Sequence, residues 1–112
     1  MSGAQSLLNK LIRRELENLQ ISKKYTGFKY LVELIEFSFD DKSQDLLCLL
    51  NLVASANQVT TDAVEHNIKH MLLSALRNGK GFKGAISQRG VDEYDSKQLI
   101  RFVVNYVRSV II

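Results

Sequence analysis

Two histidines, His66 and His70, stand four residues apart in a stretch with helical periodicity. This spacing brings both imidazoles to one side of a helix, where a pair of histidines can ligate zinc, as in the His-Glu-x-x-His motif of metalloproteases. In this chain Asn67 stands where that motif has its glutamate, and the spacing of the other residues supplies no third ligand. We therefore expect no metal site.

Three glycines, Gly79, Gly81 and Gly84, match the GxGxxG pattern of dinucleotide-binding loops. That motif requires a preceding strand and a following helix within a βαβ unit. Here the glycines follow an expected helix, and helix termination explains Gly79. No spacing of carboxylates, or of a nucleophile and a base, specifies a catalytic site. We therefore expect a protein that is not an enzyme and that binds no cofactor.

The segment that carries the two histidines, residues 61–78, is expected to form one amphipathic helix. Its apolar residues follow the spacing of a buried helical face, and they are Val64, Ile68, Met71, Leu72, Ala75 and Leu76. Thr61 or Asp62 is expected to cap its start, and Asn78 with Gly79 to end it. His66, His70 and Arg77 fall nearly opposite the buried face, with Glu65 and Lys69 on its flanks.

Apolar residues recur with helical periodicity along the whole chain, and the absence of proline favours helices joined by short connections. We expect helices over about 6–19, 28–40, 43–57, 61–78 and from Ser96 to the C-terminus, with a short helix or turn within 80–90. The expected fold class is all-α, a compact bundle of about six helices. The helix over 43–57, opened by Ser43, is apolar on nearly every side and is expected at the centre of the core. The last helix has more apolar residues than one core-facing stripe requires, which favours a homodimer contact.

Composition and length are those of one globular domain over residues 1–112. Hydrophobic residues make up 46% and charged residues 24%, and the net charge of +3 permits binding to nucleic acid. The single cysteine, Cys48, excludes an internal disulfide and is expected inside a helix as a small apolar residue. The sequence has neither an apolar signal-peptide core nor a run of about 18 apolar residues. We therefore expect a soluble, cytoplasmic protein that does not bind membranes.

The helices over 43–57 and 61–78, joined by a short turn, have the plan of a helix-turn-helix. The first would be the scaffold helix and the second the recognition helix, whose outward residues enter the DNA major groove. The alternative for these polar residues is a solvated helix surface, and their position after a short turn favours DNA. Basic residues near helix ends and loops are candidates for phosphate contacts, and they are Lys23, Lys24, Arg77, Lys80, Lys83 and Arg89.

Three segments resemble one known family more specifically. They are YTGFKYLVELIE at Tyr25–Glu36, LVASANQVTTDAVEHNIKHML at Leu52–Leu72 and ALRNG at Ala75–Gly79. Together they resemble the C-terminal effector domain of the stage zero sporulation protein A family, response regulators that commit endospore-forming bacteria to sporulation. The resemblance runs in register from about Ile12 to Arg108, and its most specific part is VEHNIKH at 64–70.

This resemblance implies a bundle of about six helices with a helix-turn-helix that binds tandem sites on double-stranded DNA as head-to-tail dimers. It also implies that outward residues of the second helix contact bases and phosphates. The matched positions are Asp62, Ala63, Glu65, His66, Lys69 and His70. We accordingly expect a sequence-specific DNA-binding transcription regulator, in which Glu65 accepts a hydrogen bond from a cytosine amino group or orients a basic neighbour.

Some matched positions depart from the family pattern. His66 and Lys69 stand where arginines are usual, and Ala63 replaces a basic residue. Arginine offers a rigid fork to guanine, whereas lysine offers one flexible ammonium, so we expect a different DNA preference or weaker binding. No receiver domain precedes the effector-like region in this sequence, so if Met1 is the true start, we expect no control by aspartyl phosphorylation. The second hypothesis is a protein-interaction module of the same fold that has lost operator binding and pairs with another regulator.

Overall fold

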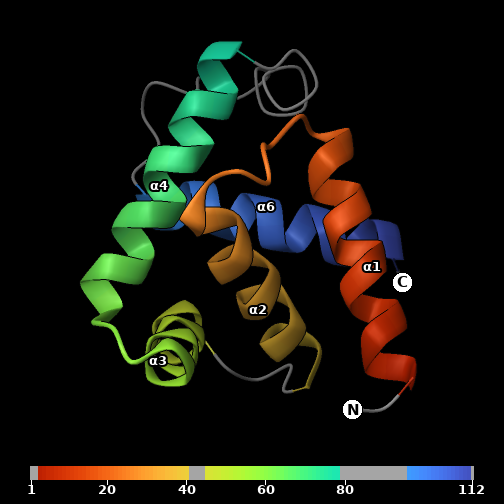
Figure 1. Ribbon diagram of the computed structural model, residues 1–112, viewed down its shortest axis with the longest axis horizontal. Helices are drawn as coiled ribbons and strands as arrows, with labels where there is room; N and C mark the ends of the chain where they lie inside the picture. Colours follow the sequence, from red (N-terminus) through yellow and green to blue (C-terminus); the bar gives the residue numbers. More distant parts are fainter. Residues whose placement is uncertain (1–2, 41–44, 79–95, 112) are drawn as a thin grey trace.

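The structure, a computed structural model, describes residues 3–40, 45–78 and 96–111, and these residues form five helices and no strand (Figure 1). The helices are α1 (Gly3–Asn18), α2 (Thr26–Asp40), α3 (Leu46–Asn57), α4 (Thr61–Asn78) and α6 (Ser96–Ile111). The prediction of an all-α fold is confirmed for this part of the chain. The short helix or turn predicted within 80–90 lies outside the described residues.

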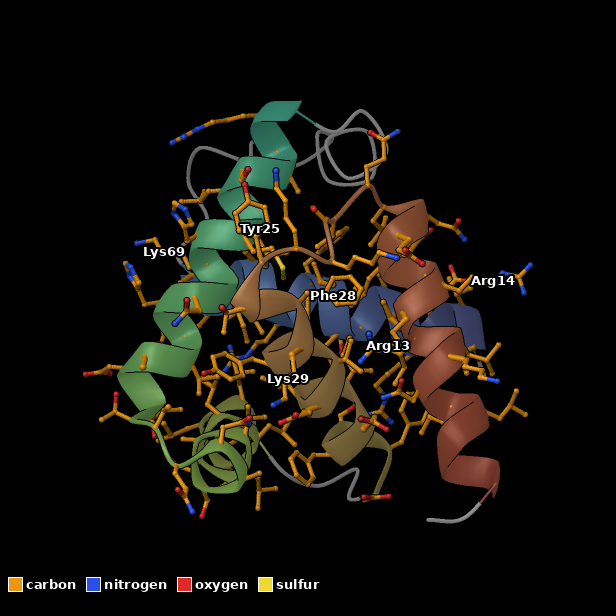
Figure 2. All side chains as sticks on the ribbon, in the orientation of Figure 1. Arg13, Arg14, Tyr25, Phe28, Lys29 and Lys69 are labelled. Carbon is orange, nitrogen blue, oxygen red and sulfur yellow. The ribbon has the colours of Figure 1, made fainter. Side chains whose placement is uncertain are left out.

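The N-terminal helix, α1, packs against α2 and α6 through the later part of its apolar stripe. Ile12 and Leu16 are fully buried, and the Arg13 guanidinium lies over the Phe28 ring of α2, 5.8 Å from the ring centre (Figure 2). Leu7, which the periodicity places on the same stripe, is 58% exposed. Leu8, its neighbour, is partly buried against the core, so Leu7 lies at the edge of the face that α1 buries.

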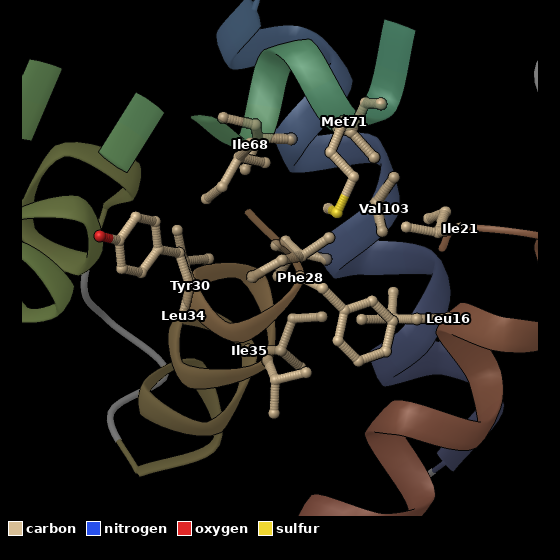
Figure 3. Packing of buried hydrophobic residues seen from close by; sticks show 14 of the residues in the cluster. Leu16, Ile21, Phe28, Tyr30, Leu34, Ile35, Ile68, Met71 and Val103 are labelled. Carbon is tan, nitrogen blue, oxygen red and sulfur yellow. The ribbon is translucent and has the colours of Figure 1, made fainter. Parts of the chain in front are cut away.

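The central helix of the bundle is α2, which packs against α1, α3, α4 and α6. The helical periodicity of the sequence places four apolar residues of α2 on one face. All four are buried, namely Tyr30, Leu31, Leu34 and Ile35. Behind it, α6 crosses α1, α2 and α4 (Figure 1). In Figure 3, side chains of α1, α4 and α6 gather beside α2, where the Phe28 ring lies next to Leu16 of α1. The core is thus built around α2.

The prediction that the helix over 43–57 forms the centre of the core is wrong. One side of α3 packs against α2 and α4, but Leu47 is 53% exposed and Leu52 is 37% exposed. Cys48 lies inside a helix, as expected, but it is exposed. An apolar helix can keep an uncovered side when only two neighbours reach it, and periodicity alone does not say how many neighbours a helix has.

The start of α3 also differs from the prediction. The helix begins at Leu46 behind Asp45, whose carboxylate accepts a hydrogen bond from the Cys48 backbone N–H at 2.9 Å. That hydrogen bond stabilises the ionised carboxylate and so lowers the pKa of Asp45. Ser43, the predicted first residue, lies outside the described residues.

Glutamines in the left-handed conformation end both α1 and α3, Gln20 with φ 64° and Gln58 with φ 57°. At the end of α3, the Val59 N–H donates to the Ala54 carbonyl at 3.0 Å and the Gln58 N–H donates to the Ser55 carbonyl at 3.4 Å. This pair of hydrogen bonds is the Schellman arrangement, which usually has glycine at the left-handed position. It turns the chain sharply, so that only residues 58–60 separate α3 from α4.

The last helix, α6, buries one apolar face in the core. It packs against α1, α2 and α4, and its buried residues are Leu99, Ile100, Val103, Val104 and Val107. These contacts use most of the apolar surface that suggested a dimer contact, although Val110 remains 47% exposed. In the parts of the chain that are described, no helix has the length and apolar character needed to cross a membrane.

Candidate nucleic-acid interface

The helix predicted to read DNA, α4, spans Thr61–Asn78 as expected. Its cap is Thr60, whose hydroxyl accepts a hydrogen bond from the Ala63 N–H at 3.0 Å, while its carbonyl accepts one from the Val64 N–H at 3.2 Å. The prediction that Thr61 or Asp62 caps the helix is therefore wrong. The short Schellman turn after α3 brings Thr60 to the capping position, so both later residues are already helical.

Side-chain and backbone contacts hold α4 against the two preceding helices. The Thr61 hydroxyl donates to Asn51 Oδ1 on α3 at 2.5 Å, which ties the start of α4 to its neighbour. Gly27 of α2 lies against the α4 backbone, because a Cβ at Gly27 would stand 2.4 Å from the Asn67 carbonyl oxygen. The predicted apolar face of α4 is buried throughout, from Val64 to Leu76. The helix is thus a rigid part of the bundle.

The outer side of α4 presents a polar stripe to solvent. Five of the predicted contact residues are exposed there, and they are Asp62, His66, Lys69, His70 and Arg77. Lys69 points away from the bundle on the side opposite to Arg14 of α1 (Figure 2). Ala63 is half-buried, and Lys80 lies outside the described residues. We refer to the five exposed residues as the α4 stripe.

Glu65 does not belong to the α4 stripe. It is half-buried, and its Oε2 accepts a hydrogen bond from the hydroxyl of Ser96, the first residue of α6. One oxygen of the carboxylate that we expected to face DNA thus joins α4 to α6. Periodicity placed Glu65 on the flank of the helix but gave no sign that α6 would cover that flank.

Tyr25, which the sequence analysis did not single out, joins the α1–α2 connection to α4. Its hydroxyl lies 2.9 Å from the Ser74 hydroxyl, and its ring meets the His70 ring edge to face with the ring centres 6.0 Å apart. The exposed Lys24 ammonium lies over the same ring, 5.6 Å from its centre. The structure therefore brings Lys24, one of the predicted phosphate contacts, beside the α4 stripe. The signal in the sequence is an aromatic residue directly after two lysines in a polar connection.

Charge on this face is mainly positive, with Lys69, Arg77 and Lys24 against one exposed carboxylate, Asp62. Within the described segments, no group of three or more histidine, cysteine or acidic side chains is placed to hold a metal ion. The arrangement offers hydrogen-bond donors and cations on a firmly held helix, which suits recognition of an anionic polymer. No family model, curated protein or solved structure matches the chain.

Proposed function

We propose that the protein binds double-stranded DNA sequence-specifically and regulates transcription, with α3 and α4 acting as a helix-turn-helix. The observation that carries this proposal is the α4 stripe, which stands on a helix held from behind by the core. Only residues 58–60 separate α4 from α3, and a hydrogen bond between Thr61 and Asn51 joins the two helices. The resemblance to sporulation effector domains supports the same use of α4.

In this proposal, different residues of the α4 stripe contact different parts of the DNA. Lys69, His66 and His70 offer donors to base edges in the major groove or to flanking phosphates. Arg77, in the last turn of α4, contacts the sugar-phosphate backbone. Asp62, in the first turn, accepts from a base amino group and interacts favourably with the helix dipole. The three residues that face the bases, Lys69, His66 and His70, hold them less firmly than arginines would, because they lack the planar guanidinium fork.

Pairing of two copies belongs to the same proposal. Val110 near the end of α6 is 47% exposed, and it offers an apolar contact at the C-terminal end of the bundle. Two domains joined there would bind adjacent DNA sites, as the resembling effector domains do. The contact is small because the core buries most of the other apolar residues of α6. We therefore expect pairing to be weak in solution and stronger on DNA that carries two sites.

The test is selection of bound fragments from random double-stranded DNA, followed by measurement of the affinity for the enriched sequence at several salt concentrations. We expect one enriched motif and an affinity that falls linearly with salt on logarithmic axes. A variant with His66, Lys69 and His70 all changed to alanine should enrich nothing. Wild-type protein that enriches no motif, or a triple variant that enriches the same one, would contradict DNA reading by α4.

The second candidate is a protein-interaction module of the same fold that pairs with another regulator. The observation that favours it is the uncovered side of α3, where Leu47, Leu52 and nearby Val59 are exposed. Large apolar side chains that the core leaves uncovered are available to a protein partner. The DNA selection separates the two candidates, because a module of this kind would enrich no motif.

A further inference from the structure

We propose that the α1–α2 connection forms a phosphate clamp, in which Lys24 binds the DNA backbone beside the groove that α4 enters and Tyr25 positions Lys24. This inference rests on the proposed DNA binding by α4 and names a second contact surface for it. The ligand is a phosphodiester group of the same duplex. The clamp consists of Lys24, Tyr25 and the two α4 residues that hold Tyr25, His70 and Ser74.

The first support is the way Tyr25 is fixed. Its hydroxyl and the Ser74 hydroxyl lie 2.9 Å apart, and the edge-to-face contact with His70 holds the ring at a steep angle of 76°. One contact lies at the end of the side chain and the other on its ring, so the ring cannot rotate freely against α4. A lysine that rests on this ring by a cation–π contact therefore keeps a defined place relative to the α4 stripe.

The second support is reach. The Lys24 ammonium lies 5.6 Å from the centre of the Tyr25 ring, and the His70 ring centre lies 6.0 Å from it. The distance from the Lys24 ammonium to the centre of the His70 ring therefore cannot exceed the sum of these two distances. This upper limit is close to the width of the B-DNA major groove, about 12 Å, so the ammonium lies within one groove width of His70. When α4 occupies the groove, Lys24 is placed to meet the backbone at its edge.

The third support is the surface next to Lys24. A pocket of about 180 Å³ lies between the connection and α4, and it is lined by Gln20, Ser22, Lys24, Tyr25, Met71, Ser74 and Ala75. Its lining offers hydroxyl, amide and ammonium donors and contains no carboxylate, which suits phosphate oxygens.

A second pocket differs in this respect. The pocket between α2, α3 and α6 is lined in part by Asp45, Arg101 and Arg108, and the Arg108 guanidinium already donates to the Ser38 carbonyl at 3.1 Å. A carboxylate in the lining repels an anion, and a guanidinium that is engaged with the backbone has fewer donors left for one. Of these two pockets, the one beside Lys24 has no carboxylate in its lining to repel a phosphate group.

The test uses Lys24→Gln with Lys10→Gln as the matched control, since both lysines are exposed and Lys10 lies on α1 near Arg14, on the far side of the bundle from Lys69 (Figure 2). Affinity for the selected duplex and for an unrelated duplex is measured across a salt series. Lys24→Gln should weaken binding to both duplexes several-fold and reduce the slope of log affinity against log salt by about 0.9, the value for one lost phosphate contact. Lys10→Gln should change neither quantity.

The positioning role of Tyr25 is tested with Tyr25→Phe, which keeps the ring but loses the contact with the Ser74 hydroxyl. Alone, it should weaken DNA binding in the same direction as Lys24→Gln but less. In the Lys24→Gln background it should have no further effect on affinity, because the lysine that it positions is gone. Equal effects in both backgrounds would show that Tyr25 acts independently of Lys24, and would overturn this part of the inference.

Two outcomes separate the clamp from DNA binding itself. If Lys24→Gln leaves affinity and salt slope unchanged while Lys69→Ala weakens binding, the clamp is wrong and DNA reading by α4 stands. If the wild-type protein enriches no duplex, both proposals fail. Thermal unfolding of each variant identifies loss of binding that comes from loss of the fold.

Discussion

Gly27 of α2 lies against the backbone of Asn67 of α4, so closely that a Cβ at Gly27 would stand 2.4 Å from the Asn67 carbonyl oxygen and 2.8 Å from its carbonyl carbon. Both atoms belong to the main chain of a helix, which cannot move aside as a flexible side chain can. This crossing sets how deeply α4 lies in the bundle, and with it the position of the α4 stripe. It also stands two residues after Tyr25, the residue that joins the α1–α2 connection to α4.

We predict that Gly27→Ala destabilises the fold. Alanine in a helix is favoured over glycine by about 1 kcal/mol, but the steric overlap at this crossing forces the helices apart at a cost of roughly 1 to 3 kcal/mol or more. The net effect should appear as a lower midpoint of urea unfolding. Lys29→Ala, at an exposed position of the same helix, is the control and should change stability little. An alanine variant as stable as the wild type would contradict the close crossing.

We predict that Gln58→Gly stabilises the protein. Gln58 ends α3 with φ 57°, a conformation that costs a residue with a Cβ roughly 1 kcal/mol and costs glycine almost nothing. Part of this gain is offset by the greater freedom of glycine in the unfolded chain, so we expect a net gain below about 1 kcal/mol. The measurement is thermal unfolding, with Gln58→Ala as the comparison. Equal stability of the glycine and alanine variants would refute the left-handed cap.

We predict that Lys69→Ala weakens DNA binding by several-fold or more, because it removes an exposed cation from the α4 stripe. Arg14→Ala removes a cation from α1 on the other side of the bundle and should leave affinity unchanged (Figure 2). A gel-shift titration at fixed salt compares the two variants. Equal losses from both would indicate that only the net charge matters and that α4 reads no sequence.

We predict that Ser96→Ala lowers stability without altering DNA preference. The Ser96 hydroxyl donates to Glu65 and joins the start of α6 to α4. Loss of a hydrogen bond to a charged group costs about 1.5 to 3 kcal/mol, and less when water can replace the donor, as at this half-buried site. Chemical denaturation measures the loss, and a repeat of the DNA selection checks the preference. A changed motif would instead assign Glu65 to base reading.

We predict that Glu36→Gln raises the melting temperature at neutral pH. Burial raises the pKa of the Glu36 carboxyl above its ordinary value of 4.5, although Asn9 Nδ2 donates to it at 3.3 Å. Because its pKa is raised, Glu36 binds its proton more tightly in the folded state than in the unfolded state. Protonation of Glu36 therefore adds to the free energy of unfolding. This stabilisation is complete below pH 4.5 and is lost as the pH rises through the folded-state pKa. The gain of the glutamine variant over the wild type should therefore shrink toward zero in acid. A difference that does not depend on pH would assign the effect to packing.

Much of the fold followed from local patterns in the chain. The bounds of α4, its buried face from Val64 to Leu76 and the buried set of α2 all agree with the structure. Periodicity predicts these features well because a helix with one apolar stripe has only one side that it can bury. The exposure of His66 and His70 follows from the same pattern, since they lie opposite the buried face.

The tertiary structure decided which outward residues stay available to a ligand and how the helices meet. Glu65 is turned to Ser96, which is far away in the sequence, and Tyr25 is held by Ser74 in the same way. The uncovered side of α3 and the contact of Gly27 with Asn67 likewise depend on which helices become neighbours. Periodicity along a single helix does not contain this information, because contacts between distant segments arise only when the whole bundle packs around α2.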